Sequence, residues 1–247
     1  MSKPYNLYHN LGYWFLFLIV LVFAGFYVSY FSVFFQPKSP VIHIHFALMS
    51  LWIVMLIIQP FFIKYKKLAW HRLVGRISYI LVPLVLLVAF LMIRYSYYNF
   101  MNSLDKNLGR VEILKRAASV QAIALFYLIW FAIFYVLAII NRKRSLIHAR
   151  YMLATSLTLL GPTVDRIFFI NLRLEKLFGV IPVEAVSFIT ADVLLAFLFM
   201  QDYRRKKSVR TLGYCLAIFL AGQVVFFTAP GNEWWTAFVT AIMKPPA

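Results

Sequence analysis

Charged residues are scarce in this sequence, and acidic residues are the scarcest of them. Of the 247 residues, 13% are charged, and only 8 are aspartate or glutamate. An average soluble domain carries roughly 25% charged residues. Hydrophobic residues make up 63% of the chain and aromatic residues 19%. A soluble chain of this composition could not cover its surface with polar groups, so we expect a protein that lies in a lipid bilayer.

Cysteine and the common catalytic motifs are also nearly or wholly missing. Cys215 is the only cysteine, so no intramolecular disulfide can form. The sequence has no Walker loop, no His-Glu-x-x-His, no Gly-x-Ser-x-Gly and no dinucleotide-binding fingerprint. The last apolar run lacks a lysine for a retinal Schiff base. No histidine follows His148, which excludes seven-span zinc hydrolases that use a His-x-x-x-His in their last span.

Long apolar runs dominate what is present. A helix needs about 20 residues to cross a hydrocarbon core roughly 30 Å thick. We therefore predict an all-α, polytopic membrane helix bundle, a single integral membrane domain over 1–247. The first run is longer than a signal-peptide core and lacks a small-residue cleavage pattern, so we expect it to be the first span. The predicted spans are 12–35, 41–63, 73–95, 117–140, 148–172, 185–202 and 211–229.

The net charge of +17 is concentrated at the ends of these runs. Lysine and arginine in short loops mark the cytoplasmic side of a membrane protein. With the N-terminus inside, the inner segments hold 15 basic residues and one acid, Asp202, while the rest of the chain holds 10 basic residues and seven acids. The C-terminus is then outside. We expect the inner charges to contact anionic lipid headgroups rather than nucleic acid. The inner basic residues are Lys3, Lys64, Lys66, Lys67, Arg72, Arg76, Arg142, Lys143, Arg144, Arg150, Arg204, Arg205, Lys206, Lys207 and Arg210.

Two predicted outer segments have their own character. Residues 96–116 are predicted to form a polar loop with a helical second half. After Pro230, Asn232 is a suitable helix N-cap, and apolar residues from Trp234 onward recur at helical spacing. Residues 232–243 are therefore predicted to form a helix in the outer interface, where indole rings favour the headgroup level.

The first candidate site lies at the predicted inner boundary. His71 and His148 each open an outward-running span, so the two rings are expected at similar depth. Two imidazoles on neighbouring helices are what a bis-histidine haem b requires. Arg72, Arg76 and Arg150 could then bind the haem propionates through charge-assisted hydrogen bonds. Alternatively, both histidines contact phosphate headgroups or cap helix ends, or they have a proton-linked or substrate-gating role.

The residues around His71 carry a family resemblance. The segment Trp70–Tyr79 reads Trp-His-Arg-x-x-Gly-Arg-x-Ser-Tyr. It resembles the helix opening of an uncharacterised bacterial multi-span family, with the similarity extending over His43 to Pro83. It is also similar to the opening that carries a haem ligand in haem A synthases, which usually have a glutamate where this chain has Lys67. The resemblance implies a protein of the bacterial cytoplasmic membrane with haem in a redox or assembly role.

The second candidate site consists of charges inside the predicted spans. Asp165 lies about 10 Å from the outer end of the fifth span, and a charge at a helix centre costs about 3 kcal/mol. Carboxylate oxygen and imidazole nitrogen are zinc ligands, although joint ligation by His43 and His45 requires a frayed helix start. Arg94 and Arg166 could line an outward-facing cavity. The possible metal ligands are His43, His45, Asp165 and Asp192.

Three functions stay open at this point. The first is histidine-based haem or metal binding in a redox or assembly role. The second is a small transporter or ligand-binding protein with an outward-facing Asp/Arg/His cavity. The third is a non-catalytic accessory subunit that packs against other membrane proteins. A purely structural alternative for the outer charges is a salt bridge between Arg166 and Asp192, with a neutral buried Asp165.

Overall fold

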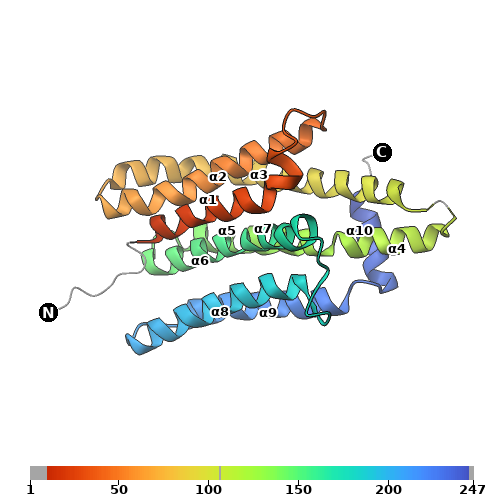
Figure 1. The fold of residues 1–247 in the computed structure, drawn as a ribbon. Helices are drawn as coiled ribbons and strands as arrows, with labels where there is room; N and C mark the ends of the chain where they lie inside the picture. Colours follow the sequence, from red (N-terminus) through yellow and green to blue (C-terminus); the bar gives the residue numbers. More distant parts are fainter. Residues whose placement is uncertain (1–9, 106, 245–247) are drawn as a thin grey trace. The chain divides into compact units, whose positions relative to one another are not determined.

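The computed structural model describes residues 10–105 and 107–244 (Figure 1). Seven helical segments are long and apolar enough to cross a membrane, and each overlaps one of the predicted spans. The predicted all-α polytopic architecture is thus confirmed. Lys3, counted above among the inner charges, lies outside the described residues. The seven segments are Leu11–Phe31, Pro40–Lys64, Leu68–Ser103, Ala122–Ile140, Ser145–Asn171, Val183–Arg204 and Arg210–Thr228.

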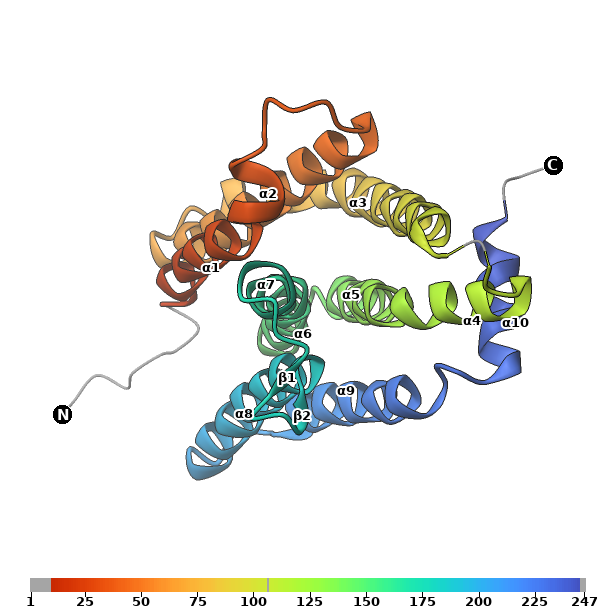
Figure 2. The same cartoon turned by 45° about the vertical axis from the view of Figure 1, so that its right-hand side comes forward.

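The chain divides into two compact units, the first formed by residues 1–88 and 159–183. Helix α1 packs against both α2 and α7 (Figure 2). A Cβ at Gly25 of α1 would lie 2.5 Å from the Thr163 carbonyl oxygen of α7, so only glycine permits this approach. The unit comprises α1 (Leu11–Phe26), the π-helical turn η2 (Tyr27–Phe31), α2 (Pro40–Lys64), the first part of α3 (Leu68–Ser103), α7 (Leu160–Arg166), the π-helical turn η3 (Ile167–Asn171), β1 (Lys176–Leu177) and β2 (Ile181–Pro182).

The second unit is formed by the described residues of 89–158 and 184–244. Its core is aromatic: Trp130 of α5 is 2% exposed and donates its indole N–H to the Ile218 carbonyl at 3.1 Å. Gly222 makes room for this indole, because a Cβ there would lie 2.5 Å from the ring. The unit contains the end of α3, α4 (Arg110–Val120), α5 (Ala122–Ile140), α6 (Ser145–Leu157), α8 (Val183–Arg204) without its first residue, α9 (Arg210–Thr228) and α10 (Glu233–Met243).

The predicted polar loop over 96–116 is largely wrong. Helix α3 continues to Ser103, so its 36 residues extend about 54 Å, well beyond a hydrocarbon core of about 30 Å. Helix α4 then begins at Arg110, which matches the predicted helical second half. The sequence misled us because polar residues such as Asn99 and Ser103 are exposed on the extended helix rather than in a loop.

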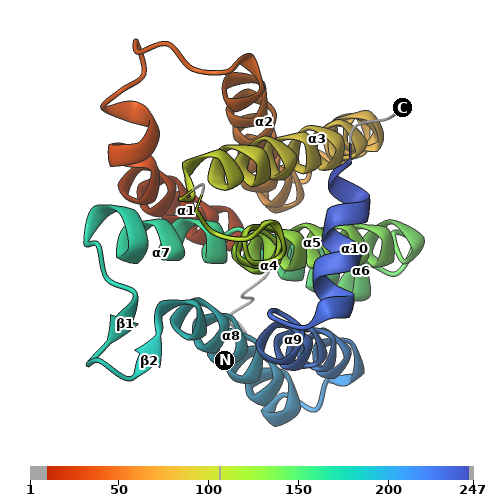
Figure 3. The same cartoon turned by 90° about the vertical axis from the view of Figure 1, so that its right-hand side faces the viewer.

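The predicted C-terminal helix is present as α10, which crosses α4 (Figure 3). Asn232 occupies the N-cap position, but its side chain donates to the Thr228 carbonyl at 2.7 Å instead of capping α10. Trp235 is buried at 4% exposure and donates its indole N–H to the Ala118 carbonyl at 3.1 Å, whereas Trp234 is 57% exposed. Of the two tryptophans at the start of α10, Trp235 therefore packs against the protein and Trp234 faces its surroundings.

Candidate functional site

A cluster of polar side chains lies where the first, second and fifth spans reach their predicted outer ends, all within the first unit. The π-helical turns η2 and η3 end two of these spans, and they pack against each other. Turn η3 also packs against α1. Such π-helical turns insert an extra residue into a helix and occur frequently at functional sites. Two of the three spans that form the cluster therefore have an irregular backbone where they meet it.

Arg166, the last residue of α7, is the central member of this cluster. Its guanidinium carbon lies 4.6 Å from the centre of the Phe26 ring, a cation–π contact. The guanidinium also interacts electrostatically with Asp165 and with His45. Its Nε is buried without a hydrogen-bond partner. Among residues 10–105 and 107–244, no hydrogen bond or ion pair involves Arg166.

Two other side chains of these spans also leave buried polar atoms without a partner among the described residues. The Nδ1 atom of His45 is one, and the Oδ1 atom of Asn171 in η3 is the other. The Asn171 amide is fixed in place, because its Nδ2 donates to the Ala24 carbonyl at 2.7 Å. Arginine can only donate, the asparagine oxygen only accepts, and imidazole can do either. Each of the three atoms could therefore make a hydrogen bond to a bound molecule.

His43 is engaged differently from His45, although only one residue separates them. Its Nδ1 atom lies 2.9 Å from the Tyr30 hydroxyl oxygen of η2. The frayed helix start that joint metal ligation required is not found, because α2 is helical from Pro40 onward. His43 therefore contacts η2, while His45 interacts with Arg166 of α7. Asp165 is buried at 7% exposure.

The remaining predicted outer residues belong to the second unit. Asp192 of α8 accepts a hydrogen bond from the Gln223 side chain at 3.1 Å. Arg94 of α3 lies with its guanidinium carbon 5.9 Å from the Tyr98 ring centre. Within the described part of the chain, no three His, Cys, Asp or Glu side chains gather as a possible metal site. The structure thus brings together His45, Asp165 and Arg166, and it places Asp192 and Arg94 in the other unit.

The two inner histidines also lie in different units, His71 on α3 in the first and His148 on α6 in the second. The Nδ1 atom of His148 lies 2.8 Å from the Ala138 carbonyl oxygen. Because a carbonyl only accepts, Nδ1 donates in this contact, and Nε2 has the lone pair in the neutral form of the ring. Metal-ligating histidines commonly have this arrangement. That His71 and His148 share a haem stays a prediction, which the absorption spectrum of protein purified from haem-supplied cells would test.

The arginines predicted to meet haem propionates differ in exposure. Arg72 and Arg76 are exposed near the start of α3. Arg150 is 1% exposed and donates to a carboxylate oxygen of Asp202 at 2.5 Å. This ion pair was not predicted from the sequence. A signal was available, since Asp202 is the only acid among the inner segments.

Comparison with protein-family models, curated proteins and solved structures finds no match to this chain. The contacts of its own side chains are therefore the basis for a functional proposal.

Proposed function

We propose that this membrane protein binds a small polar ligand bearing an acidic group, at the predicted outer end of its first unit. The ligand's carboxylate or phosphate would accept hydrogen bonds from Arg166, with His45 and Asn171 as further partners. The chain would then act as a small transporter or ligand-binding protein, in our proposal in the bacterial cytoplasmic membrane. The observation that supports this most is the buried Arg166 Nε without a hydrogen-bond partner.

A guanidinium in an apolar setting requires opposite charge and hydrogen-bond acceptors. Burying a charge costs several kcal/mol unless opposite charge and hydrogen bonds compensate for the lost water. Asp165 supplies opposite charge, but adjacent residues of a helix point about 100° apart. The Phe26 ring covers one face of the guanidinium. Its N–H groups lie in the guanidinium plane and suit a bidentate acceptor.

Thermal unfolding of the purified protein with a panel of small carboxylates and phosphate esters tests this proposal. A ligand present at 100 times its Kd stabilises the folded protein by about 2.7 kcal/mol. We expect at least one acidic compound to raise the Tm of the wild type, and Arg166→Gln to abolish that shift. The neutral amide analogue of the same compound should give no shift.

Arg94→Gln is the matched control, because Arg94 is also a half-buried arginine beside an aromatic ring on the predicted outer side. We expect this variant to keep the ligand-dependent shift. If Arg166→Gln lowers the Tm without ligand and no acidic compound stabilises the wild type, Arg166 has a structural role and the proposal is wrong.

A further inference from the structure

The turn between α8 and α9 carries an unusual excess of positive charge. Five of the seven residues from Arg204 to Arg210 are basic. Asp202 is the only acid between Asp192 and Glu233, and it is buried and already paired with Arg150. The turn therefore holds five basic residues, and Asp202 is the one acid near them in the sequence.

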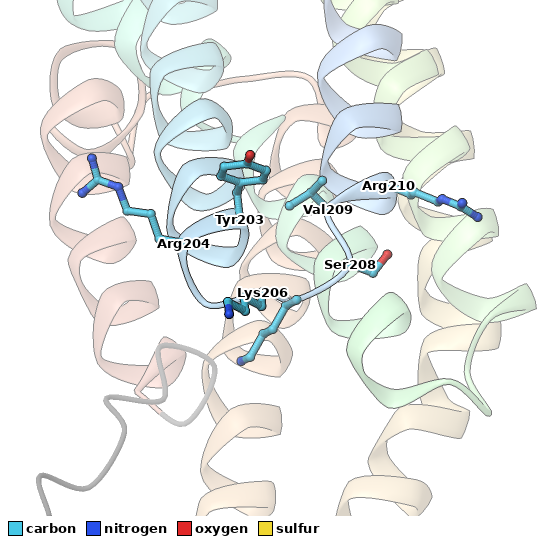
Figure 4. Close-up of a pocket in the computed structure, with 7 residues that line it drawn as sticks. Tyr203, Arg204, Lys206, Ser208, Val209 and Arg210 are labelled. Carbon is cyan, nitrogen blue, oxygen red and sulfur yellow. The ribbon is translucent and has the colours of Figure 1, made fainter.

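The same turn forms a recess of about 620 Å³, lined by Tyr203, Arg204 and residues 206–210. Figure 4 shows Tyr203 and Val209 between the two helices, Lys206 at the turn, and Arg204 and Arg210 directed to opposite sides. Tyr203 is 65% exposed. The recess thus has an aromatic and apolar side facing the helices and a basic rim at their ends.

Lys206 stands in a backbone position where glycine fits best. Its φ is +53°, in the left-handed region. The Lys207 N–H donates to the Asp202 carbonyl and the Lys206 N–H to the Tyr203 carbonyl, both at 2.9 Å. These two bonds form the Schellman motif that commonly ends helices, and its left-handed residue is usually glycine. A charged lysine therefore occupies a backbone position that glycine would adopt with less strain.

Helix α2 of the first unit ends in the same way. Lys66 has a φ of +57°, and the Lys67 N–H donates to the Phe62 carbonyl at 2.7 Å. A lysine thus occupies the left-handed position at two of the helix ends that the charge distribution places on the inner side. Because lysine recurs at this unfavourable backbone position, we infer that its positive charge has a function there.

We propose that the α8–α9 recess binds the headgroup of an anionic phospholipid from the leaflet on its own side of the membrane. Lys206, Lys207 and Arg210 would bind the phosphate oxygens, with Tyr203 at the glycerol level, where tyrosine is enriched in membrane proteins. The recess lies at the ends of two candidate spans, and this would place it near the lipid headgroups. Clusters of lysine and arginine beside a span attract anionic lipids in this way.

Lipid titration of the protein in phosphatidylcholine nanodiscs with an increasing fraction of phosphatidylglycerol, read by native mass spectrometry, tests the proposal. The triple variant Lys206→Gln, Lys207→Gln and Arg210→Gln should bind phosphatidylglycerol at least about tenfold more weakly. The matched control removes three exposed charges from the α5–α6 turn of the same unit, Arg142→Gln, Lys143→Gln and Arg144→Gln. It should weaken binding by no more than about threefold if the recess is specific.

Lys206→Gly separates lipid binding from folding, because glycine suits the left-handed backbone and removes one charge. This variant should unfold at a temperature equal to or above that of the wild type and still bind phosphatidylglycerol more weakly. Equal losses in the two triple variants would show a diffuse effect of charge and overturn the recess as a site. Unchanged binding by Lys206→Gly together with an unaffected recess triple variant would overturn it as well.

Discussion

Arg150 and Asp202 form a buried ion pair in the second unit. Their side chains are 1% and 4% exposed, and the bond between them is 2.5 Å long. Transferring such a pair from water is costly, so its net contribution to stability is small. Removing one partner is different, since the other charge then stays buried without compensation.

We predict that Arg150→Gln and Asp202→Asn each lower the free energy of unfolding by about 3–5 kcal/mol. The double variant Arg150→Gln with Asp202→Asn should lose much less than the sum of the two single losses, because no lone charge remains. Chemical unfolding in detergent measures all four members of this double-mutant cycle. Additive losses would show that the two side chains act independently.

The ion pair between Glu112 and Arg116 on α4 is the control for this cycle. Both side chains are exposed, and the Arg116 Nε donates to Glu112 at 2.6 Å. This hydrogen bond lowers the pKa of the Glu112 carboxyl, so any stability it adds is lost as the pH falls through that pKa. Glu112→Gln should leave unfolding close to wild type at neutral pH, because exposed pairs contribute little.

Residues differ in how far the sequence alone predicts their roles. The cost of Asp165 and Arg166 was visible, because charges inside an apolar run are rare and need partners. The neighbours of Arg166 could not be predicted from the sequence. Phe26 and His45 belong to other spans, and only folding brings them near Arg166. The same reason hid the partner of Arg150, which lies 52 residues away.

At the scale of elements, the spans were predictable because length and hydropathy are properties of a contiguous segment. The irregular parts were not. The break after Leu157 in the fifth span and the turns η2 and η3 lack a clear marker, although Gly161 and Pro162 do lie in that region. Packing between helices decides such details, and hydropathy does not record it.

Helix α10 permits a direct test of which aromatic residues join it to the second unit. Trp235→Ala removes a buried indole and its hydrogen bond to Ala118. We predict a loss of about 3–5 kcal/mol in the stability of the α10 contact, as for other buried tryptophans. Hydrogen exchange of the α10 and α4 amides would show the release of the helix.

Trp234→Ala on the same helix is the control, because Trp234 is 57% exposed. Exposed substitutions of this kind usually change stability by about 0.5 kcal/mol or less, so exchange in α10 should stay close to wild type. If Trp234→Ala instead released α10 and Trp235→Ala did not, the assignment of the buried face would be wrong.

At the scale of the whole molecule, the distribution of lysine and arginine predicts the orientation in the membrane. The net charge is +17, and the excess is concentrated at the alternate loops that include the α5–α6 and α8–α9 turns. Positive residues in short loops are retained on the cytoplasmic side. With seven spans, these loops and the C-terminal helix must lie on opposite sides of the bilayer.

Cysteine labelling in intact cells tests this orientation with little disturbance. Cys215 is buried, and Cys215→Ala gives a background without thiols. Into this background we would introduce Lys143→Cys in the α5–α6 turn or Lys244→Cys after α10, both exposed positions that lose the same charge. A membrane-impermeant maleimide should label the cysteine at 244 in intact cells, and the cysteine at 143 only after the membrane is opened. Labelling of 143 alone in intact cells would reverse the predicted sides, and the α8–α9 recess would then face the outer leaflet and Arg166 the cytoplasm. Labelling of both in intact cells would contradict the placement of the two positions on opposite sides of the bilayer.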